Sequence, residues 1–312
     1  MKVYRNIEDY APVQNAVVTI GTFDGVHTGH KAIITRVKQI ARETSGESVI
    51  ITFHPHPQIV LHPGENIFVL NTDEEKINLL KGIGIDHLII IPFTGEFASV
   101  SYLDFIKEVL IGKLHVRKLV IGYDHHFGKN REGDLRHLVN YGKQYHFEVD
   151  EIKAQKVDDV AVSSTKIRKA LMGGDIRAAN HFLGYPYFLS GKVVEGNNLG
   201  QSMEFPTANI DVKAPYKLIP ANGAYAVEVE IKKEKFWGML NIGMRPTING
   251  SKRVIEVNIF NFNKNIYSAF LNVSFIEKLR DEIKFNGLEH LKEQLFKDRE
   301  NAIKILDEKE SL

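Results

Sequence analysis

Apolar residues in the first half of the chain form short continuous runs, and stretches of helical period separate these runs. Short apolar runs bounded by turn residues indicate strands that are buried on both faces. We predict such strands at Ala16–Ile20, Ser48–Phe53, His87–Ile91 and Lys118–Gly122. Helices are predicted between them, at 32–41, 71–84 and 101–111. This alternation predicts a parallel sheet covered by helices on both faces, with ligands beyond the carboxyl ends of its strands.

The pattern changes near Gly184, after two short helices that are predicted at 163–174 and 175–184. Beyond this point apolar and polar residues alternate, as is typical of half-buried strands. These strands are predicted at 187–194, 224–231, 236–243, 253–260 and 271–275. Several short strands in series indicate an antiparallel barrel or sandwich, and the charged segment from Ile276 onward is predicted to be helical. We therefore expect two domains, residues 1–184 and residues 185–312.

Composition narrows the classes of function. The formal net charge is +1 over 312 residues, which argues against bulk nucleic-acid binding because that needs many phosphate-neutralising Lys and Arg. The chain has no cysteine, so disulfides, thiolate metal sites and a cysteine nucleophile are excluded. The first residues lack the apolar core of a signal peptide, and no stretch is long enough to span a bilayer. We expect a cytoplasmic protein without a membrane partner; homo-oligomerisation is possible, but the sequence gives no sign of it.

The segment GTFDGVHTGH at residues 21–30 carries the first candidate chemistry. It lies where the strand at 16–20 ends and the next helix begins. His27 and His30 are three residues apart at that helix start, so their side chains lie on one face. A helix N-terminus offers unpaired N–H groups, and the glycines allow a ligand close to the backbone. Together these features predict a receptor for a polyphosphate.

Other interpretations of this region remain open. The two histidines could bind a metal, although no carboxylate or third imidazole stands at helical spacing, or they could be surface residues. The segment SSTKIR, residues 163–168, could be a simple capping cluster with a solvated basic face. The segment HPHP, residues 54–57, reads as a stiff extended loop or as a metal site.

The segment EFPTANI, residues 204–210, carries the second candidate chemistry. Thr207 and Asn209 point to one side at strand spacing. A hydroxyl and an amide oxygen suit Mg²⁺, which shares its ligands with nucleotide phosphates. The same residues could instead simply begin a strand. Likewise Glu256, between Ile255 and Val257, is either a catalytic carboxylate or a solvent-facing strand residue.

Several motifs taken together resemble a known family. GTFDGVHTGH contains the H-x-G-H signature of the nucleotidyltransferase superfamily. With TFHPHP, GYDHHFGKNREGD and SSTKIRKAL, in this order and spacing, it resembles the bacterial bifunctional riboflavin kinase/FMN adenylyltransferase family, the FAD synthetases. FPTAN, NIGMRPT and IEVNIF extend the resemblance through the second half. It implies a Rossmann-like α/β nucleotidyltransferase domain, followed by a small antiparallel β-barrel of the riboflavin kinase type with C-terminal helices.

The resemblance implies an activity and assigns roles to residues. The chain would phosphorylate riboflavin to FMN with ATP, and then transfer AMP from a second ATP to FMN, giving FAD and pyrophosphate with Mg²⁺ as cofactor. The implied catalytic residues are His27, His30, Arg168 and Glu256. The implied nucleotide-binding residues are Gly21, Phe23, Asp24, Gly25, Asp124, Ser164, Thr165, Gly196, Gly200 and Thr207. The implied Mg²⁺ ligands are Thr207 and Asn209.

The chain departs from the family's pattern near the second site. The departures of interest are Gln201, Glu204, Asn258, Asn261 and Asn265. Glu204 adds a carboxylate to a segment that would face phosphate, and Asn258 stands where histidine is common. Two further functions therefore stay open, namely an FMN adenylyltransferase with an impaired kinase domain and a flavin-binding regulator.

Overall fold

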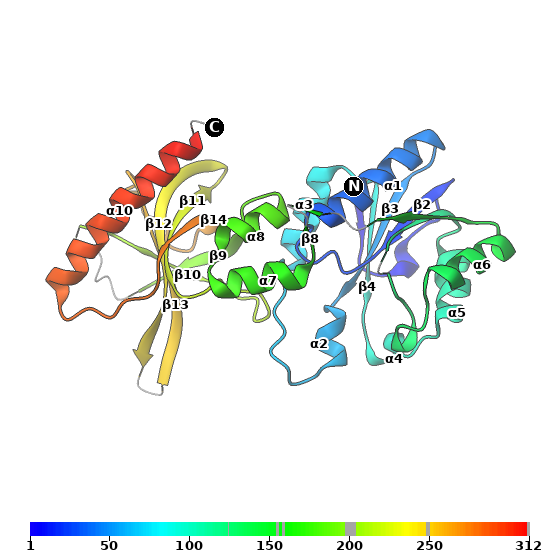
Figure 1. Cartoon of the computed structure of the whole chain (residues 1–312), viewed down its shortest axis with the longest axis horizontal. Helices are drawn as coiled ribbons and strands as arrows, with labels where there is room; N and C mark the ends of the chain where they lie inside the picture. The colour runs from blue at the N-terminus through cyan, green and yellow to red at the C-terminus, as the bar shows by residue number, and fades with distance from the viewer. Residues whose placement is uncertain (124, 154–155, 158–159, 197–203, 248–249, 311–312) are drawn as a thin grey trace. The chain divides into compact units, whose positions relative to one another are not determined.

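A computed structural model describes the chain except residues 124, 154–155, 158–159, 197–203, 248–249 and 311–312. The chain divides into two compact units, Met1–Ser164 and Thr165–Leu312. Figure 1 shows the first unit in blue to green and the second in green to red. Each unit is described by itself.

The first unit is built on a six-stranded parallel sheet in the order β1-β4-β3-β2-β5-β6. Its strands are β1 (Lys2–Tyr4), β2 (Ala16–Ile20), β3 (Ser48–His54), β4 (His87–Pro92), β5 (Val116–Gly122) and β6 (Glu148–Ile152). The strand order reverses between β2 and β5, which pair directly. The loops after these two strands therefore leave the same edge of the sheet on either side of a switch point, where α/β folds bind ligands.

Helices cover both faces of this sheet, as the apolar runs predict (Figure 1). The helices of the first unit are α1 (Thr28–Glu43), α2 (Pro57–Leu61), α3 (Asp73–Ile83), α4 (Gly95–Ala98), α5 (Tyr102–Asp104), the π-helix η2 (Phe105–Lys113) and α6 (Leu135–Tyr145), with short 3₁₀ turns η1 (Ile7–Asp9) and η3 (Lys129–Arg131). Along β2, Ala16 and Val18 pack in one core and Val17 packs in another on the opposite face. Burial on both faces is why this strand is continuously apolar.

The helix predicted over 71–84 is confirmed with its capping signals. Thr72 accepts from the backbone of Glu75, and the Glu75 side chain accepts from the backbone of Thr72, which forms a capping box. Gly84 ends the helix in the left-handed conformation at φ 79°. By contrast, the segment at 54–57 is not an extended loop throughout. His54 ends β3, His56 caps α2, and Pro57 is the first residue of that helix, a position where proline loses no hydrogen bond.

The second unit is a closed antiparallel barrel in the order β10-β13-β12-β11-β14-β9. Its strands are β9 (Phe188–Val194), β10 (Ala208–Asp211), β11 (Gly223–Ile231), β12 (Glu234–Thr247), β13 (Gly250–Ile259) and β14 (Phe270–Arg280). The helices α7 (Ser164–Gly173) and α8 (Ile176–Leu183) precede the barrel, and the small hairpin β7 (Lys156–Val157) and β8 (Val160–Ala161) precedes them. Of the two architectures predicted for this half, the structure selects the barrel.

The helix α10 (Leu288–Glu310) lies along the outside of the barrel (Figure 1). Ala302 and Leu306 from α10 join Ala226 and Met239 from the strands in one buried cluster. The prediction of helix from Ile276 onward is wrong up to residue 287. Strand β14 continues to Arg280 because its residues still pair with β11, as far as Ala224↔Arg280. Tertiary pairing overrides the helical tendency of the charged sequence there.

Candidate functional sites

The loop between β2 and α1 packs its apolar side chains into the protein. Phe23 and Val26 lie in the left-handed region at φ 47° and 36°, and both are buried against Ile34 and Leu80. Such backbone angles are unfavourable for bulky residues, so the packing must offset the strain. The loop is thereby held in one shape at the carboxyl edge of the sheet.

Asp24 fixes this loop to the neighbouring chain. Its carboxylate is 1% exposed and accepts from the backbone N–H of Leu70 at 2.8 Å and of Asn71 at 3.3 Å. Its carbonyl accepts from the hydroxyl of Ser164 at 2.8 Å. Asp24 and Ser164, both predicted nucleotide-binding residues, thus touch each other in the first unit, and the Asp24 carboxylate points into the protein.

The two histidines lie together at the start of α1. His27 is the N-cap, and its Nδ1 accepts from the backbone N–H of His30 at 3.3 Å. A neutral His27 therefore carries its proton on Nε2. The rings stack with centroids 3.6 Å apart. A side chain at Gly29 would come within 3.2 Å of the His27 ring, so the glycine between the histidines allows this stacking.

The surroundings of His30 favour its neutral form. Burial holds the pKa of His30 well below 6.5, and the neighbouring His27 and Lys76 lower this pKa further. The buried Nδ1 of His30 has no hydrogen-bond partner among the described residues. Such unpaired buried atoms are rare in native proteins and often mark a ligand site. Two N–H-bearing rings at a helix N-terminus can donate to a phosphoryl oxygen as charge develops on it.

Lys76 is a residue of this region that sequence reasoning missed. Its side chain is buried, and Nζ donates to the Thr52 hydroxyl at 3.4 Å, which in turn donates to the carbonyl of Thr22 in the histidine loop. Burial lowers the pKa of Lys76, and the charges of Asp24 and Asp73 oppose this shift. Lys76 stands four residues before the buried Leu80 on α3, and this position on an apolar helix face was the available signal.

The loop after β5 is described only in part, because Asp124 lies outside the described residues. His126 is exposed, whereas His125 packs against Phe127 with parallel rings 5.9 Å apart. Burial lowers the pKa of His125 to about 4, with smaller contributions from His126 and Arg131. Thr165 and Arg168 belong to the second compact unit, and their action on the same nucleotide stays a prediction.

In the second unit, strand register brings the predicted residues of the barrel together. Asn209 on β10 pairs directly with Glu256 on β13, so both side chains lie on one face. Thr207 and Glu256 line a pocket of about 270 Å³. Its apolar wall comes from Phe205, Met239, Leu291 and Leu295, of which the last two lie on α10. The pocket therefore joins a polar floor to an apolar wall, as sites for aromatic ligands commonly do.

Among the described residues, three carboxylates line this pocket, and they differ in their hydrogen bonds. Both oxygens of Asp298 are engaged by Arg280 and Gln294. Both oxygens of Glu282 accept hydrogen bonds, from the backbone of Met244 and from Asn222. Within the described part of the chain, Glu256 has a hydrogen bond on Oε1 alone. Glu256 is thus the pocket carboxylate that keeps an oxygen available to a substrate proton.

Gly196 leaves room for the side chain of Asn209. A Cβ on Gly196 would lie 2.0 Å from Nδ2 of Asn209, far inside van der Waals contact. The Asn209 side chain thus occupies the space left by the missing Cβ. Gly200, predicted with Gly196 to bind nucleotide, lies outside the described residues.

Comparison with known proteins follows the same division of the chain. The family model described as FAD synthetase matches residues 10–166, and the one described as riboflavin kinase matches residues 183–306. Bifunctional riboflavin kinase/FMN adenylyltransferases from Buchnera aphidicola (of Schizaphis graminum) and Bacillus subtilis are both 38% identical to the chain. The alignments cover 96% of this chain and 97% of the first relative, and 93% and 92% for the second. This chain belongs to the bifunctional riboflavin kinase/FMN adenylyltransferase family.

A solved structure agrees with the family's fold. The crystal structure of a macrolide-efflux protein from Streptococcus pneumoniae matches with a TM-score of 0.88 and 31% identity, and covers 96% of this chain and 98% of that one. Within the part of the chain that the structure describes, no helix is both long and apolar enough to cross a bilayer.

Three of the residues that the sequence analysis singles out as departures from the family pattern have defined surroundings. Glu204 forms an ion pair with Lys292 of α10 at 3.4 Å, which partly offsets its charge. Asn258 is buried and donates to the carbonyl of Pro206 at 2.7 Å. It therefore ties β13 to the residue before Thr207. Asn261 takes a left-handed conformation at φ 54°, which asparagine tolerates well. Gln201 lies outside the described residues.

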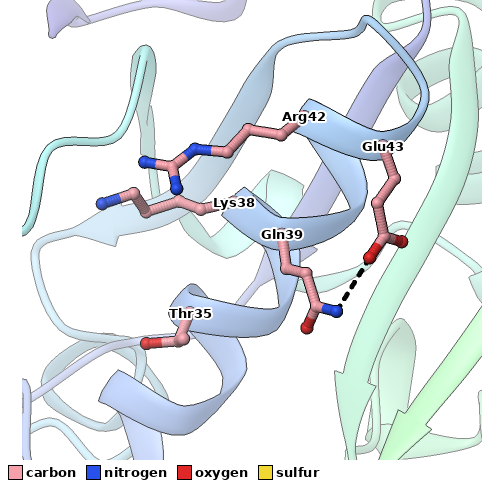
Figure 2. A pocket seen from close by; sticks show the side chains of 5 residues that line it. All are labelled: Thr35, Lys38, Gln39, Arg42 and Glu43. Carbon is pink, nitrogen blue, oxygen red and sulfur yellow. Dashed lines mark hydrogen bonds between the residues drawn. The ribbon is translucent and has the colours of Figure 1, made fainter.

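A separate hollow of about 440 Å³ lies on the outer face of α1. Figure 2 shows its lining residues, Thr35, Lys38, Gln39, Arg42 and Glu43. Gln39 donates to Glu43 at 2.8 Å, and Lys38 donates to the Ile83 carbonyl at the end of α3. These contacts stabilise the helix surface and the α3 terminus, and the lining contains none of the predicted site residues.

Proposed function

We propose that this protein makes FMN and then FAD, in two ATP-dependent steps at two separate sites. The two family models lie one after the other on the chain, and this is the observation that carries the proposal. Riboflavin and ATP give FMN and ADP, and then FMN and a second ATP give FAD and pyrophosphate. We assign the second step to residues 1–184 and the first to residues 185–312.

In the adenylyl transfer, a phosphate oxygen of FMN attacks the α-phosphorus of ATP as the bond to the pyrophosphate oxygen breaks. His27 and His30 donate N–H groups to the phosphoryl oxygens as their charge grows. The low pKa of His30 makes it a neutral donor that releases no proton. Gly21 and Gly25 admit the nucleotide to the loop, while Phe23 and Asp24 hold the loop in shape. Gly25 has φ 88°, a conformation that glycine adopts without strain.

The remaining residues predicted for this step lie in two other segments of the chain, after β5 and at the start of α7. Asp124, Thr165 and Arg168 are assigned to this step from the resemblance of their motifs alone. Ser164 supports it through its hydrogen bond to the Asp24 carbonyl. A hydroxyl and a guanidinium at a helix start are suited to bind phosphate.

In the kinase step, the oxygen of the riboflavin 5′-hydroxyl attacks the γ-phosphorus of ATP, and ADP leaves. Glu256 accepts the proton of that hydroxyl. Thr207 and Asn209 offer the hard oxygen ligands that suit Mg²⁺, and the space at Gly196 seats the Asn209 side chain. The ion would neutralise charge on the ATP phosphates. The flavin ring would lie against the apolar wall made by Phe205, Met239 and α10.

The substrates in this proposal are small molecules. A net charge of +1 suits a few local phosphate contacts better than a nucleic-acid surface. The cytoplasmic location and the independence from membranes stay predictions from the sequence.

The test uses the purified full chain with riboflavin, ATP and Mg²⁺, and chromatography of the flavins over time. FMN should appear first and FAD should follow. If riboflavin stays unchanged, FMN is supplied to the same preparation. FAD formed from FMN alone would indicate an adenylyltransferase with an impaired kinase domain. Flavin binding without any product would contradict the proposal and favour a flavin-binding regulator.

A further inference from the structure

Arg245 on β12 reaches along the barrel wall to the proposed base of the kinase step. Residue 241 of β12 pairs with Glu256 of β13, and side chains two and four residues further along a strand return to the same face. Arg245 stands four residues beyond 241 and therefore shares the face of Glu256. Its guanidinium Nη2 donates to Oε1 of Glu256 at 2.9 Å.

This ion pair is partly screened by solvent. The side chains of Arg245 and Glu256 are 28% and 22% exposed, so water reaches both charged groups and weakens the attraction between them. Both residues line the 270 Å³ pocket together with Thr207. The position of the pair beside the proposed Mg²⁺ ligand therefore suggests a role in the reaction.

Each partner keeps hydrogen-bonding capacity for a ligand. An arginine has five N–H donors in a fixed planar fork. Within the described part of the chain, one of those donors is used, on Glu256. The Glu256 carboxylate likewise uses one of its oxygens, and its Oε2 has no hydrogen-bond partner among the described residues. One oxygen of Glu256 is thus held while the other can accept a proton, and the remaining guanidinium donors face a pocket that must take a polyphosphate.

We propose that Arg245 is a catalytic residue of the kinase step that bridges the base and the phosphoryl group. One N–H holds Oε1 of Glu256, and other N–H groups donate to the γ-phosphate oxygens of ATP. The riboflavin 5′-hydroxyl gives its proton to Oε2 as its oxygen bonds to the γ-phosphorus. The bond from that phosphorus to the ADP oxygen breaks, and the guanidinium stabilises the transferring group. This inference rests on the proposed function.

The experiment measures riboflavin phosphorylation and FMN adenylylation by the full chain, carrying Arg245→Ala or Arg245→Lys. We expect Arg245→Ala to lower kcat of the kinase step about 10²–10³-fold, the usual effect of losing one preorganised donor to a developing anion. Arg245→Lys should recover part of this loss, because an ammonium keeps the charge but not the fork. FMN adenylylation should stay at the wild-type rate, and the circular dichroism and thermal unfolding of the variants should match those of the wild type, which shows that the barrel is folded.

Chemical rescue separates this role from a structural one. Guanidinium ion at millimolar concentration should raise the kinase rate of Arg245→Ala, and sodium ion at equal ionic strength should not. The matched control is Arg177→Ala, which removes an exposed arginine that pairs with Glu277 away from the pocket. This control should keep both activities.

The possible failures are distinguishable. If the wild type does not phosphorylate riboflavin, the proposed function itself fails. If the wild type does and Arg245→Ala keeps its kcat, or loses it without rescue by guanidinium, the bridging role is overturned. If Arg245→Ala misfolds, Arg245→Lys decides, and a wild-type kcat in that variant would overturn the role of the fork.

Discussion

Replacing Gly196 by alanine would place a methyl group inside the side chain of Asn209. The new Cβ would lie 2.0 Å from Nδ2 and 2.6 Å from Cγ of Asn209, where ordinary contacts begin near 3.4 Å. The amide must therefore move by about 1.4 Å. Asn209 is part-exposed, so its side chain can move toward solvent and the cost in stability should be small. Its proposed position as a Mg²⁺ ligand should nevertheless be lost.

A misplacement of about 1 Å in a catalytic arrangement can lower the rate about 10²-fold. We therefore expect Gly196→Ala to lower kcat of riboflavin phosphorylation by about two orders of magnitude and to raise the Mg²⁺ concentration needed for half-maximal rate. Conversion of FMN to FAD by the same protein should not change. The assay is flavin chromatography over a Mg²⁺ series.

The matched control is Gly173→Ala at the end of α7, where an added Cβ meets nothing within 4 Å. It should keep both activities. A Gly196→Ala protein with wild-type kinase rate and wild-type Mg²⁺ dependence would refute the reasoning, because the amide could then move without consequence.

Two further predictions concern stability. Asp298→Ala leaves Arg280, whose side chain is 15% exposed, without its buried partner on α10. The free energy of unfolding, measured in urea, should fall by about 3–5 kcal/mol. A fall below about 1 kcal/mol would contradict a stabilising role of this pair between α10 and the barrel. Burial lowers the pKa of His125 to about 4, so between about pH 6.5 and 4 the unfolded chain binds a proton that the folded chain does not, and stability falls as the pH falls. This residue adds at most about 1.4 kcal/mol per pH unit, so the Tm of His125→Phe should fall less steeply with decreasing pH than that of the wild type, and equal slopes would exclude this role for His125.

The sheet of the first unit was predictable because its central strands are buried on both faces. Such burial leaves a continuous apolar run in the sequence, as at Ala16–Ile20. The edge strand β6 (Glu148–Ile152) was not predicted, since three of its five residues are acidic. Its charges pair with basic neighbours instead, for example Asp150 with Arg36 at 2.8 Å. Only the tertiary structure supplies those partners.

The candidate sites divide in the same way. His27 and His30 were found because a local spacing at a strand-to-helix junction carries their chemistry. The pair of Arg245 and Glu256 depends on the register of two strands, which the sequence does not specify. The spacing of Lys76 from Leu80 signals its place on the apolar face of α3, but its contact with Thr52 depends on the tertiary structure. Sequence patterns thus find candidate residues one motif at a time, as with Thr207, Asn209 and Glu256, and miss the contacts between motifs that long-range pairing creates.

The central claim is that one chain carries two independent active sites, and two single variants test it most directly. His30→Ala and Glu256→Gln are each assayed with riboflavin and, separately, with FMN. We predict that His30→Ala still makes FMN but forms no measurable FAD, because its donor serves only adenylyl transfer. Glu256→Gln should convert supplied FMN to FAD while its kinase rate falls about 10²–10⁴-fold, the usual effect of losing a general base. If either substitution, in a folded protein, removed both activities equally, the two-site account would be contradicted.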